Sequence, residues 1–358
     1  MTVAPQDTPP GRETPPEQEG GPEQEGGPVR QHAGRGAAAA IYNSAVAAWA
    51  IAAAWEIGAL DELDRERTLD AESFASRRGL DPAATAGLFR ALASVDVVQR
   101  RGHVVAAAGA FDEVYQYKSF FHWLSRGSAE LFRQMPSVLV SENRTGQFYQ
   151  RDAAAIAYAC REIDELCYAP AFWDAMGRLD FELSNVVDLG CGSGGRVLDI
   201  LARYPRARGI GIDIARPALD AARADSLAAG AADRVAFVEA DVLDLDERPE
   251  FADTELITCF MMGHDFWPRE NCVAALRRFR KVFPSAQRLL LGDATRTAEA
   301  GDRDLPVFTL GFELGHDLMG AFLPTVPDWE SVFDEAGWKL VRTNRIDMAV
   351  GEVVFELE

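Results

Sequence analysis

The stretch Val186-Val-Asp-Leu-Gly-Cys-Gly-Ser-Gly-Gly195 combines a short apolar run with glycines at alternate positions, and a helical pattern follows at 196–204. This order predicts a strand, a tight glycine-rich turn and a helix. Glycine lets the backbone turn sharply and lets a ligand approach the main chain closely. The stretch therefore predicts a nucleotide-type cofactor site, although several cofactor classes use such a turn.

Strand and helix patterns alternate downstream of this turn. Strands are expected at 185–188, 209–213, 235–239, 255–260 and 287–292, with a last pair at 339–346 and 351–357. Such alternation is typical of a mostly parallel, doubly wound α/β sheet with right-handed crossovers. In this sheet type the carboxyl ends of the strands face the ligand cleft.

Acidic residues follow the first three strands. Asp213 ends the second strand, where a carboxylate accepts hydrogen bonds from ribose hydroxyls. Asp241 suits an adenine amine, with Val242 packed on the ring, and Asp188 suits an ammonium group better than a pyrophosphate. This combination favours S-adenosylmethionine (SAM) over a dinucleotide. The expected cofactor contacts are Asp188, Gly190, Gly192, Asp213, Asp241, Val242, Phe260 and Met261.

Two Gly-His-Asp tripeptides contain two of the five histidines. His264-Asp265 follows the fourth strand and His316-Asp317 lies further along the chain, both among methionine and bulky apolar residues. Two imidazoles that converge in an apolar pocket suit a divalent or trivalent metal ion. Alternatively, His264 is a general base without a metal, or the histidines only pack. Two histidines do not distinguish iron from zinc.

The segment before the sheet has three parts. Residues 1–35 are rich in Pro, Gly, Glu and Gln and are expected to form a disordered tail. A largely apolar helix is expected at 45–57. Helices at 71–78 and 82–94, followed by a hairpin at 97–105, give a winged-helix outline. This outline is typical of DNA binding or of dimerisation, and the overall charge favours dimerisation.

Composition restricts partners and compartment. The net charge is −20, from 36 Lys and Arg against 56 Asp and Glu, so a nucleic-acid partner is not expected. Five cysteines without a C-x-x-C pair predict a reducing cytoplasm. The alanine-rich stretch 37–54 contains Tyr42, Asn43 and Ser44, and we expect neither a membrane span nor a membrane partner.

A polar, turn-rich segment at 142–152 interrupts a mainly helical region. Its Arg144 and Arg151 are candidates to reach an anion in the cleft. The simpler interpretation of each is a surface salt bridge.

From about residue 37 onward the chain resembles small-molecule methyltransferases of the plant and antibiotic O-methyltransferase superfamily. His264-Asp265-Phe266-Trp267 is similar to the His-Asp-Trp segment that holds their catalytic base. Within that superfamily the chain more closely resembles bacterial α-keto acid C-methyltransferases of the phenylpyruvate C3-methyltransferase type. The segments that carry this resemblance are 142–146, 259–268, 291–296 and 311–317.

The resemblance implies a class I Rossmann-like SAM methyltransferase domain at 166–358, preceded by a mostly helical winged-helix dimerisation domain at 36–165, and a homodimer. It also implies that His264 and His316 hold a non-haem iron or zinc ion, which a 2-oxo acid chelates. Arg144 matches an arginine placed to steady the substrate carboxylate. The expected catalytic residues are Arg144, His264, Asp265 and His316.

The implied reaction is metal-dependent methyl transfer from SAM to C3 of a 2-oxo acid such as phenylpyruvate or 4-methyl-2-oxovalerate. The product would supply β-methyl amino acid units of a peptide antibiotic. Asp265 either orients a ligand or accepts the C3 proton. The alternative is a metal-free O-methyltransferase in which His264 is the general base for a phenolic substrate.

Overall fold

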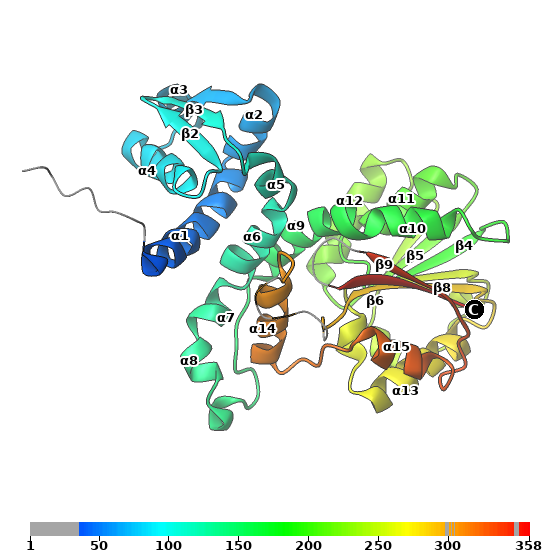
Figure 1. Ribbon diagram of the computed structural model, residues 1–358. Helices are drawn as coiled ribbons and strands as arrows, with labels where there is room; N and C mark the ends of the chain where they lie inside the picture. Colours follow the sequence, from blue (N-terminus) through cyan, green and yellow to red (C-terminus); the bar gives the residue numbers. More distant parts are fainter. Residues whose placement is uncertain (1–35, 298–300, 302, 304, 347–350) are drawn as a thin grey trace, which may run out of the picture. The chain divides into compact units, whose positions relative to one another are not determined.

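The computed structural model describes residues 36–297, 301, 303, 305–346 and 351–358. The tail expected at 1–35 lies outside the described residues. Residues 43–358 form one unit, and most of its longer elements are labelled in Figure 1. The domain boundary expected between residues 165 and 166 stays a prediction.

Seven strands form one sheet in the order β6-β5-β4-β7-β8-β10-β9. Their bounds are β4 (Asn185–Leu189), β5 (Arg208–Asp213), β6 (Val235–Glu239), β7 (Leu256–Phe260), β8 (Arg288–Ala294), β9 (Leu340–Ile346) and β10 (Glu352–Leu357). The first five pair in parallel, and β10 is antiparallel to both β8 and β9. The expected doubly wound sheet is confirmed. Its strand order reverses between β4 and β7, where open α/β sheets bind ligands.

Helices cover both faces of this sheet (Figure 1). One face carries α10 (Ala169–Met176), α11 (Gly195–Arg203) and α12 (Arg216–Ala228), and the other carries α13 (Arg269–Val282) and α15 (Val326–Phe333). Leu290 packs with Phe172 of α10 in the hydrophobic core on one face. Its neighbour Leu289 packs with Phe279 of α13 in the core on the other face. Successive side chains point to opposite faces. The central strands are therefore buried on both sides, which explains their nearly continuous apolar runs.

The helix pair and hairpin of the winged-helix outline are present. The elements are α1 (Ala37–Glu56), α2 (Ala59–Glu66), β1 (Thr68–Asp70), α3 (Ala71–Arg78), α4 (Pro82–Ala93), β2 (Val98–Arg101) and β3 (Val104–Ala107). Asp70 and Asp81 cap α3 and α4 by accepting hydrogen bonds from backbone N–H groups. The strands form a small sheet in the order β1-β3-β2. Its role in dimerisation stays a prediction.

Short helices connect this part to the large sheet. They are α5 (Phe111–Gln116), α6 (Lys118–His122), the π-turn η1 (Trp123–Gly127), α7 (Ala129–Arg133), α8 (Met135–Val138), α9 (Ala153–Ile163) and the π-turn η3 (Asp164–Tyr168). The segment from β8 to β9 also contains α14 (Thr309–Met319). Single π-turns frequently occur at functional sites, and η1 and η3 both contribute residues to the cavities described below.

We did not expect the alanine-rich stretch to be apolar enough for a membrane span, and its average hydropathy shows that this expectation was wrong. Helix α1 is long and apolar enough to cross a membrane, with a hydropathy of 1.5 over an 18-residue window of which 28% is buried. Tyr42, Asn43 and Ser44 are too few to lower this average. Because a core helix of a soluble protein passes the same criterion, the absence of a membrane partner stays a prediction.

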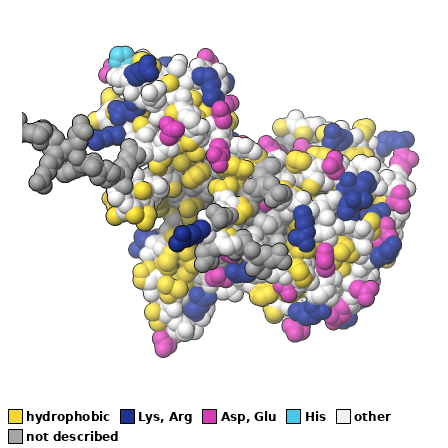
Figure 2. Space-filling view, viewed as in Figure 1, with side chains coloured by type: hydrophobic (Ala, Val, Ile, Leu, Met, Phe, Trp, Pro, Cys, Tyr) yellow, Lys and Arg dark blue, Asp and Glu magenta, His cyan; other side chains and the backbone are white. Residues whose placement is uncertain are grey.

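Hydrophobic side chains are exposed along the helical segments. On the face shown in Figure 2 they gather over the helical region, whereas charged side chains are interspersed over the region of the large sheet. Exposed examples are Trp49, Leu139, Tyr158, Leu310 and Phe322. Exposed apolar surface of this kind suits an interface, and the homodimer remains a prediction.

Candidate active site

The glycines after β4 form the expected turn. Gly190, Gly192 and Gly194 have φ angles of 68°, 52° and 79°, in the left-handed region that residues with a Cβ rarely adopt. A Cβ at Gly190 would lie 2.0 Å from Met262 Sδ, and one at Gly194 would lie 2.8 Å from a ring carbon of Phe237. Conformation and space therefore both require glycine here.

A cavity of about 680 Å³ is formed by this loop and the carboxyl ends of β4, β5 and β7. All eight predicted cofactor contacts line it: Asp188, Gly190, Gly192, Asp213, Asp241, Val242, Phe260 and Met261. Asp213 Oδ2 accepts a hydrogen bond from Gly192 N at 2.8 Å and so joins the second strand to the loop. Acidic side chains greatly outnumber basic ones in the lining. The cavity therefore suits a ligand with positive charge, such as a sulfonium and an ammonium group.

Asp188 is the most deeply buried acid of this cavity. Its carboxylate accepts a hydrogen bond from the Thr258 hydroxyl at 2.6 Å. Burial raises the pKa of Asp188 to about 6, although the charge of Arg196 and the Thr258 hydrogen bond act in the opposite direction. Arg196 forms an ion pair with Asp164 and lies over the ring of Phe260, 3.5 Å from its centroid. The sequence did not reveal Asp164 or Arg196, because no motif joins them.

A second cavity, of about 320 Å³, adjoins the first. The two share Cys160, Met261 and Asp265 in their linings. Met261 follows β7 with a φ of 56°, which is uncommon for a residue with a Cβ and marks local backbone strain. A ligand in the second cavity would therefore lie beside a ligand in the first.

His264 and His316 both line this second cavity. Their ring centroids are 4.9 Å apart and the rings are nearly perpendicular, at 88°. His264 Nδ1 lies 2.8 Å from Asp293 Oδ1, and His316 Nδ1 lies 2.8 Å from the Phe312 carbonyl oxygen. Because a carbonyl only accepts, His316 Nδ1 carries its hydrogen and Nε2 has the lone pair. Within the described part of the chain, no group hydrogen-bonds to either Nε2 atom.

The two imidazoles differ in acidity. Burial lowers the pKa of His264, but the charge and hydrogen bond of Asp293 outweigh it and leave the pKa above its ordinary value. Burial, followed by repulsion from His264, lowers the pKa of His316 to about 3. Asp293 is itself fully buried, and its Oδ2 has no hydrogen-bond partner among the described residues. The site thus places a neutral imidazole beside a more basic one.

These histidines fit a metal ion only as a partial ligand set. No group of three or more His, Cys, Asp or Glu side chains that could hold a metal is found among the described residues. The Nδ1 partners fix both rings and leave both Nε2 atoms for a ligand, as is usual for metal-bound histidine. The chain therefore offers two nitrogen ligands, and a metal bound here would take its remaining ligands from elsewhere.

The two arginines of the polar segment occupy different positions. Arg151 lines the second cavity, lies over Trp123 at 5.0 Å and donates to Met319 Sδ at 3.2 Å. Its Nε is buried without a partner, no ion pair to a described carboxylate is found, and burial lowers its pKa. Arg144 does not line the cavity, because its guanidinium donates to two backbone carbonyls, one of them that of Asp317 at 3.0 Å. The cation that faces the cavity is therefore Arg151.

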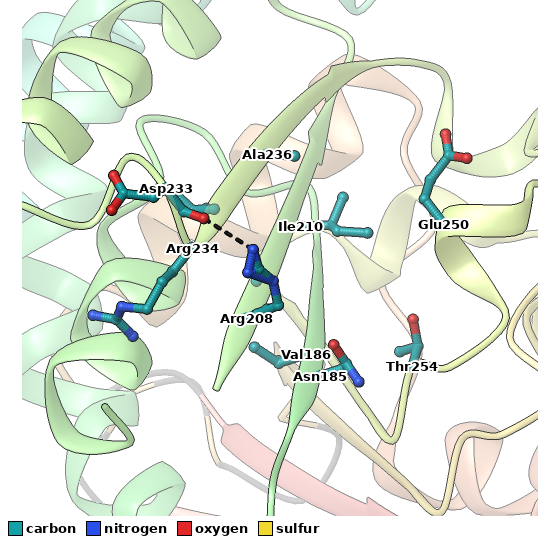
Figure 3. A pocket seen from close by; sticks show the side chains of 11 residues that line it. Asn185, Val186, Arg208, Ile210, Asp233, Arg234, Ala236, Glu250 and Thr254 are labelled. Atoms are coloured by element: carbon teal, nitrogen blue, oxygen red, sulfur yellow. Dashed lines mark hydrogen bonds between the residues drawn. The ribbon is translucent and has the colours of Figure 1, made fainter. Parts of the chain in front are cut away.

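A third cavity, of about 240 Å³, lies at the opposite edge of the sheet. Figure 3 shows it at the amino ends of β4, β5 and β6, where Arg208 donates to the Asp233 carbonyl at 3.2 Å. None of the predicted site residues lines it. Since ligands of such sheets bind outside the carboxyl ends of the strands, the first two cavities form the candidate active site.

The sequence is similar to that of a known protein over nearly its whole length. Residues 186–284 match a family model described as a methyltransferase domain. Methyltransferase ungE' of Aspergillus campestris is 49% identical over 328 residues, which cover 89% of this chain and 96% of that protein. The chain belongs to this methyltransferase family. An indolepyruvate C-methyltransferase of Streptomyces griseus is 29% identical over 169 residues, 46% of this methyltransferase and 49% of that protein.

The methyltransferase also shares its fold with solved structures. A methyltransferase of calicheamicin biosynthesis, solved with S-adenosylhomocysteine bound, has a TM-score of 0.61 at 21% identity, over 89% of this chain and 97% of that one. The expected fold, an antibiotic O-methyltransferase type with a helical N-terminal region, is confirmed. The protein is a SAM-dependent methyltransferase, and the cavity over the glycine turn is the candidate site for SAM.

Proposed function

We propose that this methyltransferase transfers the methyl group of SAM to C3 of a 2-oxo acid. The supporting observation is Arg151, a largely buried cation that faces the same cavity as His264 and His316 and lacks a described ion-pair partner. A substrate carboxylate would satisfy this guanidinium with charge-assisted hydrogen bonds, whereas a neutral phenol would leave it buried without a counter-charge. The similarity to an indolepyruvate C-methyltransferase also supports a 2-oxo acid.

The aromatic part of the remaining lining suits an apolar body for the side chain of that acid. Trp123, Phe308 and Phe312 surround the cavity beside the histidines. Buried aromatic rings favour a flat or branched apolar group. Phenylpyruvate and 4-methyl-2-oxovalerate both meet this requirement.

Carbon C3 becomes a nucleophile only after it loses a proton. His264 and His316 would hold an iron or zinc ion, which when bound would polarise the keto oxygen and acidify the C3 proton. Arg151 binds the carboxylate, and the cavity boundary at Met261 and Asp265 directs C3 toward the sulfonium methyl. Asp265 is our candidate for the proton acceptor. The C3–H bond breaks, the C3–CH₃ bond forms as the S–CH₃ bond breaks, and S-adenosylhomocysteine leaves.

A second candidate function is metal-free O-methylation of a phenol. The hydrogen bond between His264 and Asp293 supports it, because a carboxylate-held imidazole with a raised pKa can remove a phenolic proton. The phenolate oxygen would then attack the same sulfonium methyl. Arg151 and His316 have no role in that reaction, which is why we place it second.

We further propose a cytoplasmic homodimer with no nucleic-acid or membrane partner, in which the exposed hydrophobic surface contributes to the dimer interface. Its product would supply β-methyl amino acid units of a peptide natural product. The net charge of −20 and the exposed apolar side chains support these proposals.

The test is incubation of the full chain with SAM and 2-oxo acids deuterated at C3, followed by mass spectrometry of the product. C-methylation adds one methylene equivalent and releases one deuteron from C3. Methylation of a phenolic oxygen leaves both deuterons in place. Methylation of phenols, together with no C3-methylated product from any 2-oxo acid, would contradict the proposal.

A further inference from the structure

Glu352 lies in the wall of the substrate cavity, and its side chain points to the face of the sheet opposite to that of Asp293. Strands β8 and β10 are antiparallel, with Val353 opposite Asp293 and Glu352 opposite Ala294. Because neighbours along a strand point to opposite faces, Asp293 points to the face covered by α13 and α15, toward Trp329. Glu352 points to the other face, where β10 meets the π-turn η3. Both side chains line the cavity.

The surroundings of Glu352 combine apolar groups with weak donors. Glu352 is 2% exposed, and Ile163 and Tyr168 line the cavity with it. Burial raises the pKa of the Cys167 thiol, and the charge and hydrogen bond of Glu352 raise it further. Burial also raises the pKa of Tyr168, to which Glu352 adds. A carboxylate has roughly four acceptor positions, so Glu352 can accept from a ligand as well as from protein groups.

We propose that Glu352 selects a substrate whose side chain ends in a hydrogen-bond donor, such as a phenolic hydroxyl or a ring N–H. The inference rests on the proposed function, which places the substrate carboxylate at Arg151 and the keto group at the histidines. The side chain then extends across the cavity between aromatic walls toward Glu352. A site that hydrogen-bonds a substrate hydroxyl discriminates against the analogue without it.

Phenylpyruvate and its para-hydroxy analogue test this, because they differ only by the hydroxyl. With the full chain and SAM, we expect kcat/KM to be at least about 10-fold higher for the hydroxylated acid. Glu352→Leu should reduce this ratio to within about twofold of one. Glu352→Gln, which keeps the shape and an acceptor oxygen, should reduce it only partly and covers the case in which the leucine variant does not fold.

Glu356→Gln is the matched control. Glu356 lies four residues further along the same face of β10, is 3% exposed, and pairs with Arg178 outside the cavity. In Glu356→Gln, the ratio of kcat/KM between the two acids should equal that of the unmodified enzyme. A ratio at or below one in the unmodified enzyme, or a ratio that the Glu352 and Glu356 variants share, overturns the role of Glu352 while C3-methylation of both acids stands. If neither acid is methylated at C3, the proposed function itself fails, and this inference fails with it.

Discussion

Asp293 Oδ1 lies 2.8 Å from His264 Nδ1, and this contact sets both the orientation and the acidity of the imidazole that faces the substrate cavity. Burial lowers the pKa of His264, whereas Asp293 raises it. Asp293→Asn keeps an acceptor at the same place but removes its charge. We therefore expect the pKa of His264 to fall below the ordinary value of 6.5.

NMR titration of the histidine ring signals in metal-free protein measures this change. Asp317→Asn is the control, because Asp317 is an exposed residue that pairs with Arg296 and makes no described contact with His264. A His264 pKa that stays raised in Asp293→Asn would contradict the electrostatic role assigned to this pair.

Substitution of Arg151 and substitution of Arg144 are expected to have different kinetic effects. Arg151→Met removes the cation of the cavity, so KM for a 2-oxo acid should rise by roughly 10- to 100-fold, the range of a hydrogen bond to a charged group. Arg144→Met breaks contacts to two backbone carbonyls and should lower the melting temperature with a smaller effect on KM. Steady-state kinetics and thermal melting compare the two. The reverse order in KM would return the carboxylate-binding role to Arg144, as the sequence predicted.

A metal held by the histidine pair predicts that His316→Ala and His264→Ala each lower metal affinity by at least about 10-fold. Elemental analysis and titration with Fe²⁺ or Zn²⁺ measure this independently of turnover. His122→Ala is the control, since His122 is equally buried but pairs with Glu56, away from both cavities. Removal of the metal should abolish C-methylation and leave SAM affinity unchanged. Full activity of metal-free enzyme would support the base mechanism at His264 instead.

Much of the fold could be predicted because its signals are local. Alternating apolar and helical runs located all seven strands of the large sheet within one or two residues at most bounds, and the glycine turn located the cavity that we assign to SAM. Strand β1 was not predicted, because three residues are too few for a periodic pattern. The membrane criterion for α1 was misjudged because three polar residues were given more importance than the average of the whole helix.

The parts of the site that the sequence did not reveal depend on contacts between distant segments. Asp293 lies near the carboxyl end of β8, and the rule that carboxyl ends of strands face the cleft would have marked it. Composition did not separate Arg151 from Arg144, because both belong to one polar segment, and the resemblance favoured Arg144. Their different contacts in the fold, including the packing of Arg151 against Trp123, separate them. Glu352 was hidden because the face to which it points depends on the register between β8 and β10.

A side chain at Gly190 in the glycine turn is expected to weaken SAM binding because it would clash with Met262. In Gly190→Ala the new Cβ would lie 2.0 Å from Met262 Sδ, so Met262 must move within the lining of the SAM cavity. We expect SAM affinity to fall by at least about 10-fold, measured by calorimetry. Gly230→Ala is matched to it, with a φ of 65° and no atom within 4 Å of the new Cβ. Both variants should lose about 1–2 kcal/mol from left-handed strain, but only Gly190→Ala should lose SAM affinity; equal affinities would refute the clash.

Asp188 predicts that SAM affinity depends on pH. Burial raises the pKa of Asp188 to about 6 in the cofactor-free protein, so its carboxyl group is increasingly neutral as the pH falls below that value. The ammonium group of SAM favours the ionised carboxylate. Affinity should therefore rise with pH through this range and level off above it, with at most about a tenfold change per pH unit below the pKa. Asp188→Asn should bind SAM more weakly and without this dependence.

Calorimetry between about pH 5 and pH 8 measures this dependence. The control ligand is 5′-methylthioadenosine, which keeps the adenosine but lacks the amino-acid group and has a neutral thioether in place of the sulfonium. Its affinity should not follow the ionisation of Asp188, because it has no positive charge to interact with the carboxylate. A dependence shared by both ligands would assign the effect to another group of the cavity, and a SAM affinity independent of pH would show that the ammonium group does not depend on the charge of Asp188.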